Sequence, residues 1–381
     1  MTSRTTRRSV LGMAGAAIVS GAALSGTAVA DTGRIPDGLK PGGELDQLVA
    51  DMAARDEFSG SLLLTHRRRT VLARSYGMAN KARSISNGPD TVFGLASVAK
   101  LITGIAIGQL AQARRLAYTD PLGMYLDGFA SEIADAVTIH HLLVHTSGLG
   151  DYMGMPGYWE TARTWTSAEQ ALAGTMDFIR QDRPASAPGA SVVYSNSGYF
   201  LLGEIAAKVC GQPFADYLRE HVFLPPGMNS TDSYTKPQWR DNPRIARPYR
   251  KEASGERVDT LEEHTFLEGV FSTCGDMARL ADALLGNKLL TPAVTQLTLN
   301  GKLPSISRGP EPLLDFQAYG GQATLSANNE WSYKMGGGSS DGASTDFAMY
   351  PDRGWVVVIL SNYDLGNQRA ITRLSRQLIT Q

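Results

Sequence analysis

The sequence predicts an α/β lobe, whose sheet is built by both ends of the chain, and an all-α lobe inserted between them. Strand patterns occur in two groups near opposite ends of the sequence: residues 60–66, 70–77, 325–336, 345–350 and 355–361. The segment between the groups, roughly residues 115–250, is mainly helical and rich in loops. Strands from both ends can therefore share one sheet, with the helical segment lying beside it.

Residues 1–30 have the layout of an export signal. Arg7 and Arg8 belong to a basic start, and an uncharged stretch rich in Gly, Ala and Ser ends at an A-x-A cleavage site, residues 28–30. The paired arginines and the weakly apolar middle are typical of a twin-arginine signal. Polar and glycine residues interrupt the stretch too often for a good spanning helix. We therefore expect a protein that is secreted, periplasmic or cell-wall associated, with no stable membrane anchor after cleavage.

The first strands and the first long helix are predicted from periodicity. Residues 60–66 and 70–77 alternate in the manner of two strands, joined by a tight basic turn at residues 67–69. Residues 97–113 read as a helix that is apolar nearly all round. Because such a helix has no polar face to turn to water, we expect it to be buried.

Helix boundaries are readable in the rest of the chain. Residues 166–169 (TSAE) fit a capping box at a helix start. Gly211 fits the C-cap position of a helix over residues 198–209. A last amphipathic helix places one apolar stripe at Ala370, Ile371, Leu374 and Leu378.

These elements predict one two-lobed domain over residues 45–381. Its α/β lobe takes residues 45–115 and 250–381, and its helical lobe takes residues 116–249. A linker over residues 31–44 precedes the domain. The cleft between two such lobes is the expected place for a substrate.

Composition excludes several classes of protein. The chain has 381 residues, of which 43% are hydrophobic and 19% are charged, so it can bury a large core. A net charge of −1 without a basic patch argues against a nucleic-acid partner. Cys210 and Cys274, the two cysteines, exclude a disulfide scaffold and a four-cysteine zinc site. They can form at most one bridge, and we favour two buried free thiols.

A serine followed three residues later by a lysine occurs twice. Ser97 and Lys100 start the buried helix, where that spacing puts both side chains on one face and the serine sits among free backbone N–H groups. A charged lysine among apolar neighbours is costly unless it is partnered or deprotonated, which favours a functional role. Ser233 and Lys236 run into Pro237, which disfavours helical geometry at Lys236. We interpret that copy as a loop.

Tyr194 and Asn196 form the chain's Tyr-x-Asn. A tyrosine hydroxyl beside lysines can act as a base, and an asparagine can hold a substrate amide. Taken alone, the pattern favours a turn with a helix cap, because Ser195 and Asn196 are good capping residues.

Lys334, Met335 and Gly336 end a predicted strand, and further glycines follow. Glycines at a strand edge let a substrate backbone lie against the strand. The alternative is a strand that runs into a glycine turn and leaves Lys334 merely exposed.

The order Ser-x-x-Lys, Tyr-x-Asn, Lys-x-Gly forms one recognised set. With it the chain resembles the serine DD-peptidase and β-lactamase superfamily, in the branch of class C β-lactamases, D-Ala-D-Ala carboxypeptidases and related esterases. Three further stretches are typical of that branch: residues 138–148 (TIHHLLVHTSG), 194–203 (YSNSGYFLLG) and 223–228 (FLPPGM). The resemblance covers most of residues 45–365. Many members have His-x-Gly in place of Lys-x-Gly, and the glycine stretch here differs in length from the usual pattern.

The resemblance implies a β-lactamase/DD-peptidase fold, in which an antiparallel sheet is flanked by helices and the active site lies in the cleft beside the helical lobe. It also implies that Ser97 forms an acyl-enzyme with help from Lys100 and Tyr194. Which of the two takes the proton is open at this stage.

The resemblance assigns binding roles as well. Asn196 would orient the substrate amide, and Lys334 would attract a substrate carboxylate. Gly336 and Gly337 would line the substrate, with the oxyanion between the backbone N–H groups of Ser97 and Gly337.

We therefore expect an exported serine hydrolase without metal or organic cofactor, similar to D-Ala-D-Ala carboxypeptidases and β-lactamases. Its partner would be a small-molecule or peptide substrate: a cell-wall peptide, a β-lactam, or a related amide or ester. An esterase or acyltransferase on the same fold, and a non-catalytic penicillin-binding sensor, are the alternatives. The sequence does not choose among these substrates and predicts no oligomeric state.

Two rival motifs fail on the sequence. Residues 338–342 fit the G-x-S-x-G of α/β-hydrolases, but that triad needs a later histidine, and the last histidine is His264. His141 and His145 are spaced like metal ligands, yet no glutamate or acidic third ligand accompanies them. We expect no metal.

Overall fold

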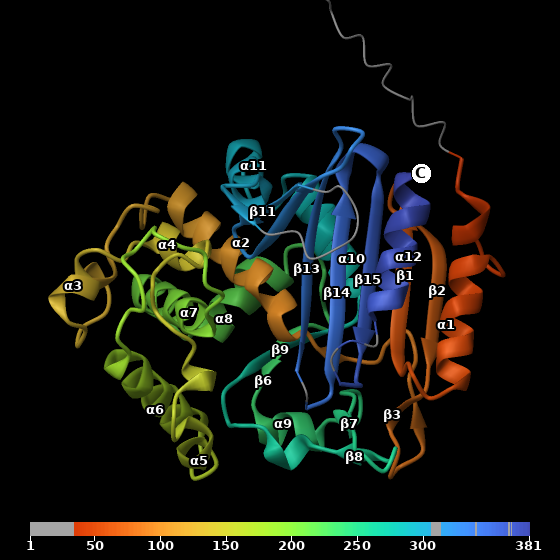
Figure 1. Cartoon of the computed structure of the whole chain (residues 1–381), viewed down its shortest axis with the longest axis horizontal. Helices are drawn as coiled ribbons and strands as arrows, with labels where there is room; N and C mark the ends of the chain where they lie inside the picture. Colours follow the sequence, from red (N-terminus) through yellow and green to blue (C-terminus); the bar gives the residue numbers. More distant parts are fainter. Residues whose placement is uncertain (1–33, 306–313, 340, 365, 367) are drawn as a thin grey trace, which may run out of the picture. The chain divides into compact units, whose positions relative to one another are not determined.

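The first and last strands of the chain lie side by side in one sheet (Figure 1). The structure is a computed structural model that describes residues 34–305, 314–339, 341–364, 366 and 368–381. The predicted export signal therefore lies outside the described residues.

The main sheet has eight strands in the order β10-β11-β12-β13-β14-β15-β1-β2, and all neighbours are antiparallel. The strands are β1 (Gly60–His66), β2 (Arg69–Tyr76), β10 (Leu303–Ser305), β11 (Leu314–Ala318), β12 (Gly321–Leu325), β13 (Trp331–Ser339), β14 (Ala343–Tyr350) and β15 (Trp355–Ser361).

Most strand predictions hold, and one needs correction. β1 and β15 have the predicted bounds, and the two-residue loop between β1 and β2 has positive φ at Arg67 and Arg68, as a tight hairpin turn requires. The single strand predicted over residues 325–336 is wrong. It is the end of β12 and the start of β13, separated by a turn in which Asn329 adopts a left-handed φ of 61°.

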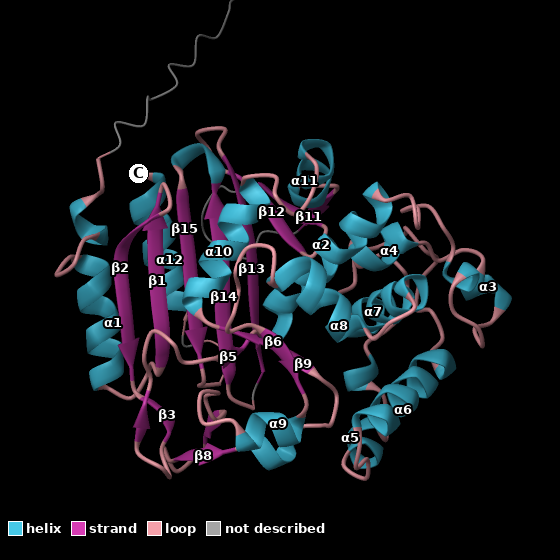
Figure 2. Cartoon of the chain, turned by 180° about the vertical axis from the view of Figure 1, so that it is seen from behind, coloured by secondary structure: helices cyan, strands magenta, loops and turns pink. Residues whose placement is uncertain are grey.

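Each face of the sheet is covered by helices (Figures 1 and 2). On one face α1 (Glu44–Ala54) and α12 (Arg369–Thr380) pack together. On the other face lie α2 (Ala99–Gln112) and α10 (Cys274–Leu285). The larger hydrophobic core is on the α2 side, and a separate core lies under α1 and α12.

The predicted linker over residues 31–44 is too long. The folded unit starts at Ile35, and a 3-10 turn over Asp37–Leu39 precedes α1. Leu39 is fully buried in the core under α1 and α12. Burial of this apolar side chain in the core holds the segment before α1 against the domain.

The middle of the chain forms the predicted helical lobe. This lobe lies beside α2, on the side of the molecule away from β1 and β2 (Figure 2). Its helices are α3 (Ser131–Ala134), α4 (Ile139–Leu143), α5 (Tyr158–Ala162), α6 (Ala168–Gln181), α7 (Asn196–Cys210) and α8 (Phe214–Leu218). The remaining helices are α9 (Lys236–Asp241) and α11 (Pro292–Leu299). Short strands form three small sheets: β3 (Met78–Asn80) with β4 (Ile85–Ser86), β5 (Phe93–Gly94) with β9 (Gly269–Ser272) and β6 (Asp232–Tyr234), and β7 (Tyr249–Lys251) with β8 (Arg257–Asp259).

Helix boundaries correct two local predictions and confirm a third. The cap of α6 differs from the predicted capping box: Ser167 is the N-cap, its hydroxyl accepts the Gln170 N–H, and the Gln170 side chain accepts the Thr166 N–H. Gly211 ends α7 with a left-handed φ of 71°, as predicted. Lys236 does begin a helix, because Pro237 falls in the first turn, where proline is tolerated.

Two further observations complete the fold. In the described part of the chain, no helix combines the length and the apolar character needed to cross a bilayer. Cys274 is a buried free thiol, as predicted, whereas Cys210 is free but only partly buried.

Candidate active site

Ser97 is held at the N-terminal end of α2, beside β13. It lies in a 3-10 turn over Ala96–Val98, so the predicted helix starts two residues later than expected, at Ala99. The turn is anchored on both sides: Leu95 N–H donates to the Val270 carbonyl (2.9 Å), and Thr345 Oγ1 donates to the Leu95 carbonyl (3.0 Å). Ala96 has a φ of 46°, a strained conformation that neighbouring structure must enforce. The serine is therefore presented by a rigid backbone.

Lys100 is buried directly behind Ser97. Its Nζ lies 3.3 Å from Ser97 Oγ and 2.7 Å from Asn196 Oδ1. It also lies 4.9 Å from the centre of the Tyr194 ring. With only 8% of the residue exposed, these contacts offset the cost of placing an ammonium group among apolar side chains.

Tyr194 completes the cluster from the helical lobe. Its hydroxyl oxygen lies 2.5 Å from Ser97 Oγ, and it donates more weakly to Asn196 Oδ1 at 3.4 Å. Tyr194 is 46% exposed, so the serine and tyrosine hydroxyl groups are open to an incoming molecule. The structure thus brings Ser97, Lys100, Tyr194 and Asn196 together, at the junction of the sheet lobe and the helical lobe.

The imidazole ring of His145 packs against the ring of Tyr194. The two rings are 4.7 Å apart, and His145 Nδ1 accepts the Ser195 N–H at 3.2 Å. Burial, reinforced by the nearby Lys100 ammonium, lowers the pKa of His145 to about 3. The imidazole is therefore neutral near pH 7 and acts as a fixed hydrogen-bond acceptor. It lies outside α4, and no group of three or more His, Cys, Asp or Glu among the described residues is arranged to hold a metal.

Asp151 is a member of the site that the sequence reasoning missed. Asn196 Nδ2 donates to Asp151 Oδ2 at 2.7 Å, and Asp151 Oδ1 accepts the Met153 N–H at 3.0 Å. Asp151 precedes a short 3-10 turn over Tyr152–Gly154. A single acid in a loop carries no periodic pattern, so no signal in the sequence could have singled it out.

The structure does not place Lys334 at the site, which corrects the prediction. Its Nζ is bound to both carboxylate oxygens of Asp315, at 3.0 and 3.2 Å. Successive strand residues point to opposite faces, and Met335 is the residue that faces the α2 core. A Cβ added to Gly337, on the same face as Met335, would lie 2.6 Å from Ser97 N. Gly337 therefore lies against Ser97, Met335 lies on the same face of the strand, and Lys334 faces the other way.

The predicted oxyanion partner also needs correction. The Lys334 carbonyl points toward β12, since it lies 2.9 Å from a Cβ built on Gly321. Backbone groups in antiparallel strands alternate between the two edges. Gly336 and Gly338 therefore turn their N–H groups to the β12 edge, which is open beyond Lys334, and Gly337 turns its N–H to β14. A donor that joins the Ser97 N–H must come from Gly336 or Gly338.

Replacing Lys334 is expected to cost stability rather than catalysis. Asp315 is only 7% exposed, and among the described residues Lys334→Met leaves its carboxylate with the Thr324 hydroxyl group as its side-chain partner. We expect the free energy of unfolding to fall by about 1–3 kcal/mol, measured by guanidinium denaturation, and kcat/KM for an activated ester to change less than threefold. The double variant with Asp315→Asn should recover part of the stability. A tenfold loss of kcat/KM at unchanged stability would return Lys334 to the active site.

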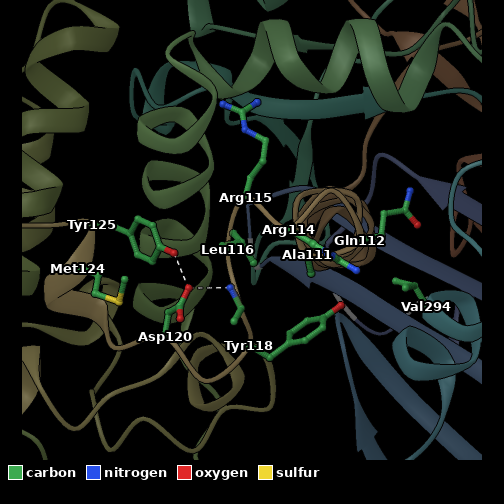
Figure 3. A pocket seen from close by; sticks show the side chains of 11 residues that line it. Ala111, Gln112, Arg114, Arg115, Leu116, Tyr118, Asp120, Met124, Tyr125 and Val294 are labelled. Carbon is green, nitrogen blue, oxygen red and sulfur yellow. Dashed lines mark hydrogen bonds between the residues drawn. The ribbon is translucent and has the colours of Figure 1, made fainter.

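A separate hollow of about 540 Å³ lies at the C-terminal end of α2 (Figure 3). Its wall includes Tyr125, whose hydroxyl donates to Asp120 Oδ2 at 2.5 Å, and the same oxygen accepts the Ala117 N–H. Ser97 lies at the opposite end of α2. None of the site residues predicted from the sequence lines this hollow.

Comparison with known proteins fits this geometry. A family model described as Beta-lactamase matches residues 45–381. The chain is 33% identical to penicillin-binding protein 4* of Bacillus subtilis (strain 168) over 195 residues, which are 50% of this chain but only 42% of that protein. It is 21% identical to the teichoic acid D-alanine hydrolase of Staphylococcus aureus over 327 residues, 85% of this chain and 75% of the relative. A solved penicillin-binding protein from Bacillus halodurans superposes with a TM-score of 0.76 at 27% identity, covering 86% of this chain and 99% of that structure.

Proposed function

Because the chain belongs to the beta-lactamase family, we propose that it is an exported serine hydrolase that forms an acyl-enzyme on Ser97 and acts on D-amino-acid peptides, amides or esters. The observation that carries the proposal is the contact of Ser97 Oγ with both Lys100 Nζ and the Tyr194 hydroxyl group. Nucleophilic serine chemistry needs a proton acceptor within hydrogen-bonding reach of Oγ, and either Lys100 or Tyr194 can take that role once it has lost its own proton.

The geometry supports a two-step acyl transfer. Ser97 Oγ attacks the substrate carbonyl carbon, while its proton passes to the Tyr194 phenolate or the neutral Lys100 amine. The oxyanion that forms is held by the Ser97 N–H and a strand N–H from Gly336 or Gly338. The leaving alcohol or amine takes up a proton, and the acyl group remains on Ser97 as an ester. Water then attacks this ester, regenerates the Ser97 hydroxyl group and releases the acid.

The position of Met335 favours esters and amides over carboxylate-terminated peptides. A cation on β13 would attract the terminal carboxylate of a D-Ala-D-Ala peptide, but the strand places the uncharged Met335 on the face that packs toward α2 and turns Lys334 toward Asp315. A relative named for hydrolysis of D-alanine from teichoic acid fits this preference. D-Ala-D-Ala carboxypeptidase or β-lactamase activity is the second candidate, supported by the relatives named as penicillin-binding proteins.

Export is part of the proposal and is supported by the sequence. Arg7 and Arg8, the mild apolar stretch after them and the A-x-A at residues 28–30 are the features that support it.

A substrate panel tests the proposed function on the protein without residues 1–30. It consists of p-nitrophenyl acetate, D-alanyl-p-nitroanilide, a peptide ending in D-Ala-D-Ala, and a chromogenic cephalosporin. We expect kcat/KM for the best ester or amide to exceed that for the peptide by about tenfold or more. This is the effect expected when the terminal carboxylate of the peptide finds no cation on β13 to pair with. Release of D-Ala as the fastest reaction would favour the carboxypeptidase instead. A covalent adduct without turnover of any substrate would favour the sensor.

A further inference from the structure

The amide of Asn196 is already committed within the protein. Its Oδ1 accepts from Lys100, and its Nδ2 donates to Asp151 at 2.7 Å, with Met153 Sδ at 3.6 Å. A substrate whose acyl group carries a neutral amide would need a donor at this place for its carbonyl oxygen. The Asn196 Nδ2 group makes its strongest hydrogen bond to the Asp151 carboxylate. The site therefore presents carboxylate oxygens, which accept hydrogen bonds, where the sequence predicted an amide donor.

Charge at the site points the same way. Asp151 is joined to Ser97 through Asn196 and Lys100, so its carboxylate lies one side chain beyond the residues that touch the serine. In the described residues, Lys100 is the cation bonded to this cluster, and it is held by Ser97 and Asn196. The other lysine expected here, Lys334, is paired with Asp315. A second negative charge on the substrate would be repelled by Asp151, and a positive charge would be attracted.

The side chain of Asp151 is also partly open to solvent beside the site. Asp151 and Asn196 are partly exposed, Met153 is exposed, and Tyr194 opens the same side of the site. When Ser97 Oγ bonds to a carbonyl carbon, an amino group on the next carbon is two bonds from the reacting atom. One side chain, Asn196, separates Asp151 from Lys100 and Tyr194, so we expect the ammonium group to reach Asp151 past the partly exposed Asn196.

We propose that Asp151 binds the free α-ammonium group of the substrate's acyl part, so that the substrates are aminoacyl esters or amides with an unblocked amino group. This inference rests on the proposed function, because it assigns the acyl group that Ser97 accepts. The ammonium would donate to the Asp151 carboxylate, while the reacting carbonyl carbon lies over Ser97 Oγ.

Paired substrates test the inference. D-alanyl-p-nitroanilide and N-acetyl-D-alanyl-p-nitroanilide differ only in the charge and size of the amino substituent, and p-nitrophenyl acetate reports Ser97 chemistry without an amino group. We expect the wild-type protein to prefer the free amine by about 10- to 100-fold in kcat/KM, the range of a hydrogen bond to a charged group. The preference should fall as the pH rises through about 8, where an α-amino group loses its proton.

The variant Asp151→Asn separates recognition from a structural role. We expect it to reduce the free-amine preference by about tenfold or more, mainly through KM, with a smaller and equal loss for the acetylated anilide and the acetate ester. Asp182→Asn is the matched control: its carboxylate accepts the N–H of the neighbouring Gly150 at 2.6 Å and makes no contact with Asn196. This control should keep the wild-type preference.

Each outcome bears on one of the two proposals. Wild-type protein that hydrolyses p-nitrophenyl acetate through Ser97 but shows no preference for the free amine overturns the inference and leaves the proposed function standing. Equal losses on all three substrates in Asp151→Asn also overturn it, since they indicate that Asp151 only positions Asn196. If no substrate shows Ser97-dependent turnover, the proposed function itself fails. The preference for the free amine and its pH dependence are measured on the wild-type protein. The inference can therefore be overturned even if Asp151→Asn does not fold.

Discussion

Replacing Ser97 with alanine is expected to abolish covalent turnover. Hydrolysis of an activated ester should fall by roughly 10⁴–10⁶-fold, as it does when the nucleophile of a serine hydrolase is removed. The fold should persist, because the Ser97 side chain bonds only to Lys100 and Tyr194 among the described residues. Intact mass after incubation with benzylpenicillin or an activated ester is the measurement: an acyl adduct should appear on the wild-type protein and be missing from the variant.

The second Ser-x-x-Lys pair supplies the control for this experiment. Ser233 lies in β6 and Lys236 starts α9, so Ser233→Ala should retain the adduct and the wild-type rate. An adduct of full yield on Ser97→Ala would remove Ser97 from the mechanism.

Replacing Lys100 with methionine is expected to lower kcat by roughly 10²–10⁴-fold, the usual contribution of general acid–base help. Methionine keeps most of the buried volume but leaves Ser97 Oγ and Asn196 Oδ1 without their shared donor. Pre-steady-state release of p-nitrophenol from p-nitrophenyl acetate measures the acylation step directly. Circular dichroism and thermal unfolding would show whether the variant remains folded.

Comparison with Tyr194→Phe identifies the proton acceptor. The tyrosine oxygen is closer to Ser97 Oγ than Lys100 Nζ, at 2.5 against 3.3 Å. If Lys100→Met acylates at the wild-type rate while Tyr194→Phe is slow, the proton goes to Tyr194 and the lysine prediction is wrong. The reverse result assigns the proton to Lys100. Lys236→Met, in the second motif, should leave acylation unchanged.

Much of this site was predictable because its strongest signals are local. An apolar helix that carries a lysine three residues after a serine is readable from periodicity alone, and chain order then selected Tyr194 and Asn196. The family resemblance inferred from that order is confirmed by the match over residues 45–381. The α/β fold with its antiparallel sheet and inserted helical lobe is confirmed as well.

The errors on β13 have one physical cause. Side chains along a strand alternate between two faces, so a slip of one residue moves every side chain to the opposite face. The sequence places the motif on Lys334, whereas Gly337 faces Ser97 and Met335 lies on the same face as Gly337. The unusual length of the glycine stretch was the signal that the motif did not align residue for residue. Asp151 was missed for a different reason: only the tertiary fold brings its loop to Asn196.

The pairing of β1 with β15 has a consequence for how the chain is made. The Ser59 carbonyl accepts from Ser361 Oγ across 302 positions of sequence, and β1 can pair with β15 only after the chain up to Ser361 has left the ribosome. Until then the nascent chain carries β1 with a single hairpin partner and an apolar open edge, the feature through which sheets aggregate. Contacts so distant in sequence also slow folding. Synthesis must therefore have passed β15 before the native sheet can form, and a chain that terminates before β15 lacks the strand that pairs with both β1 and β14.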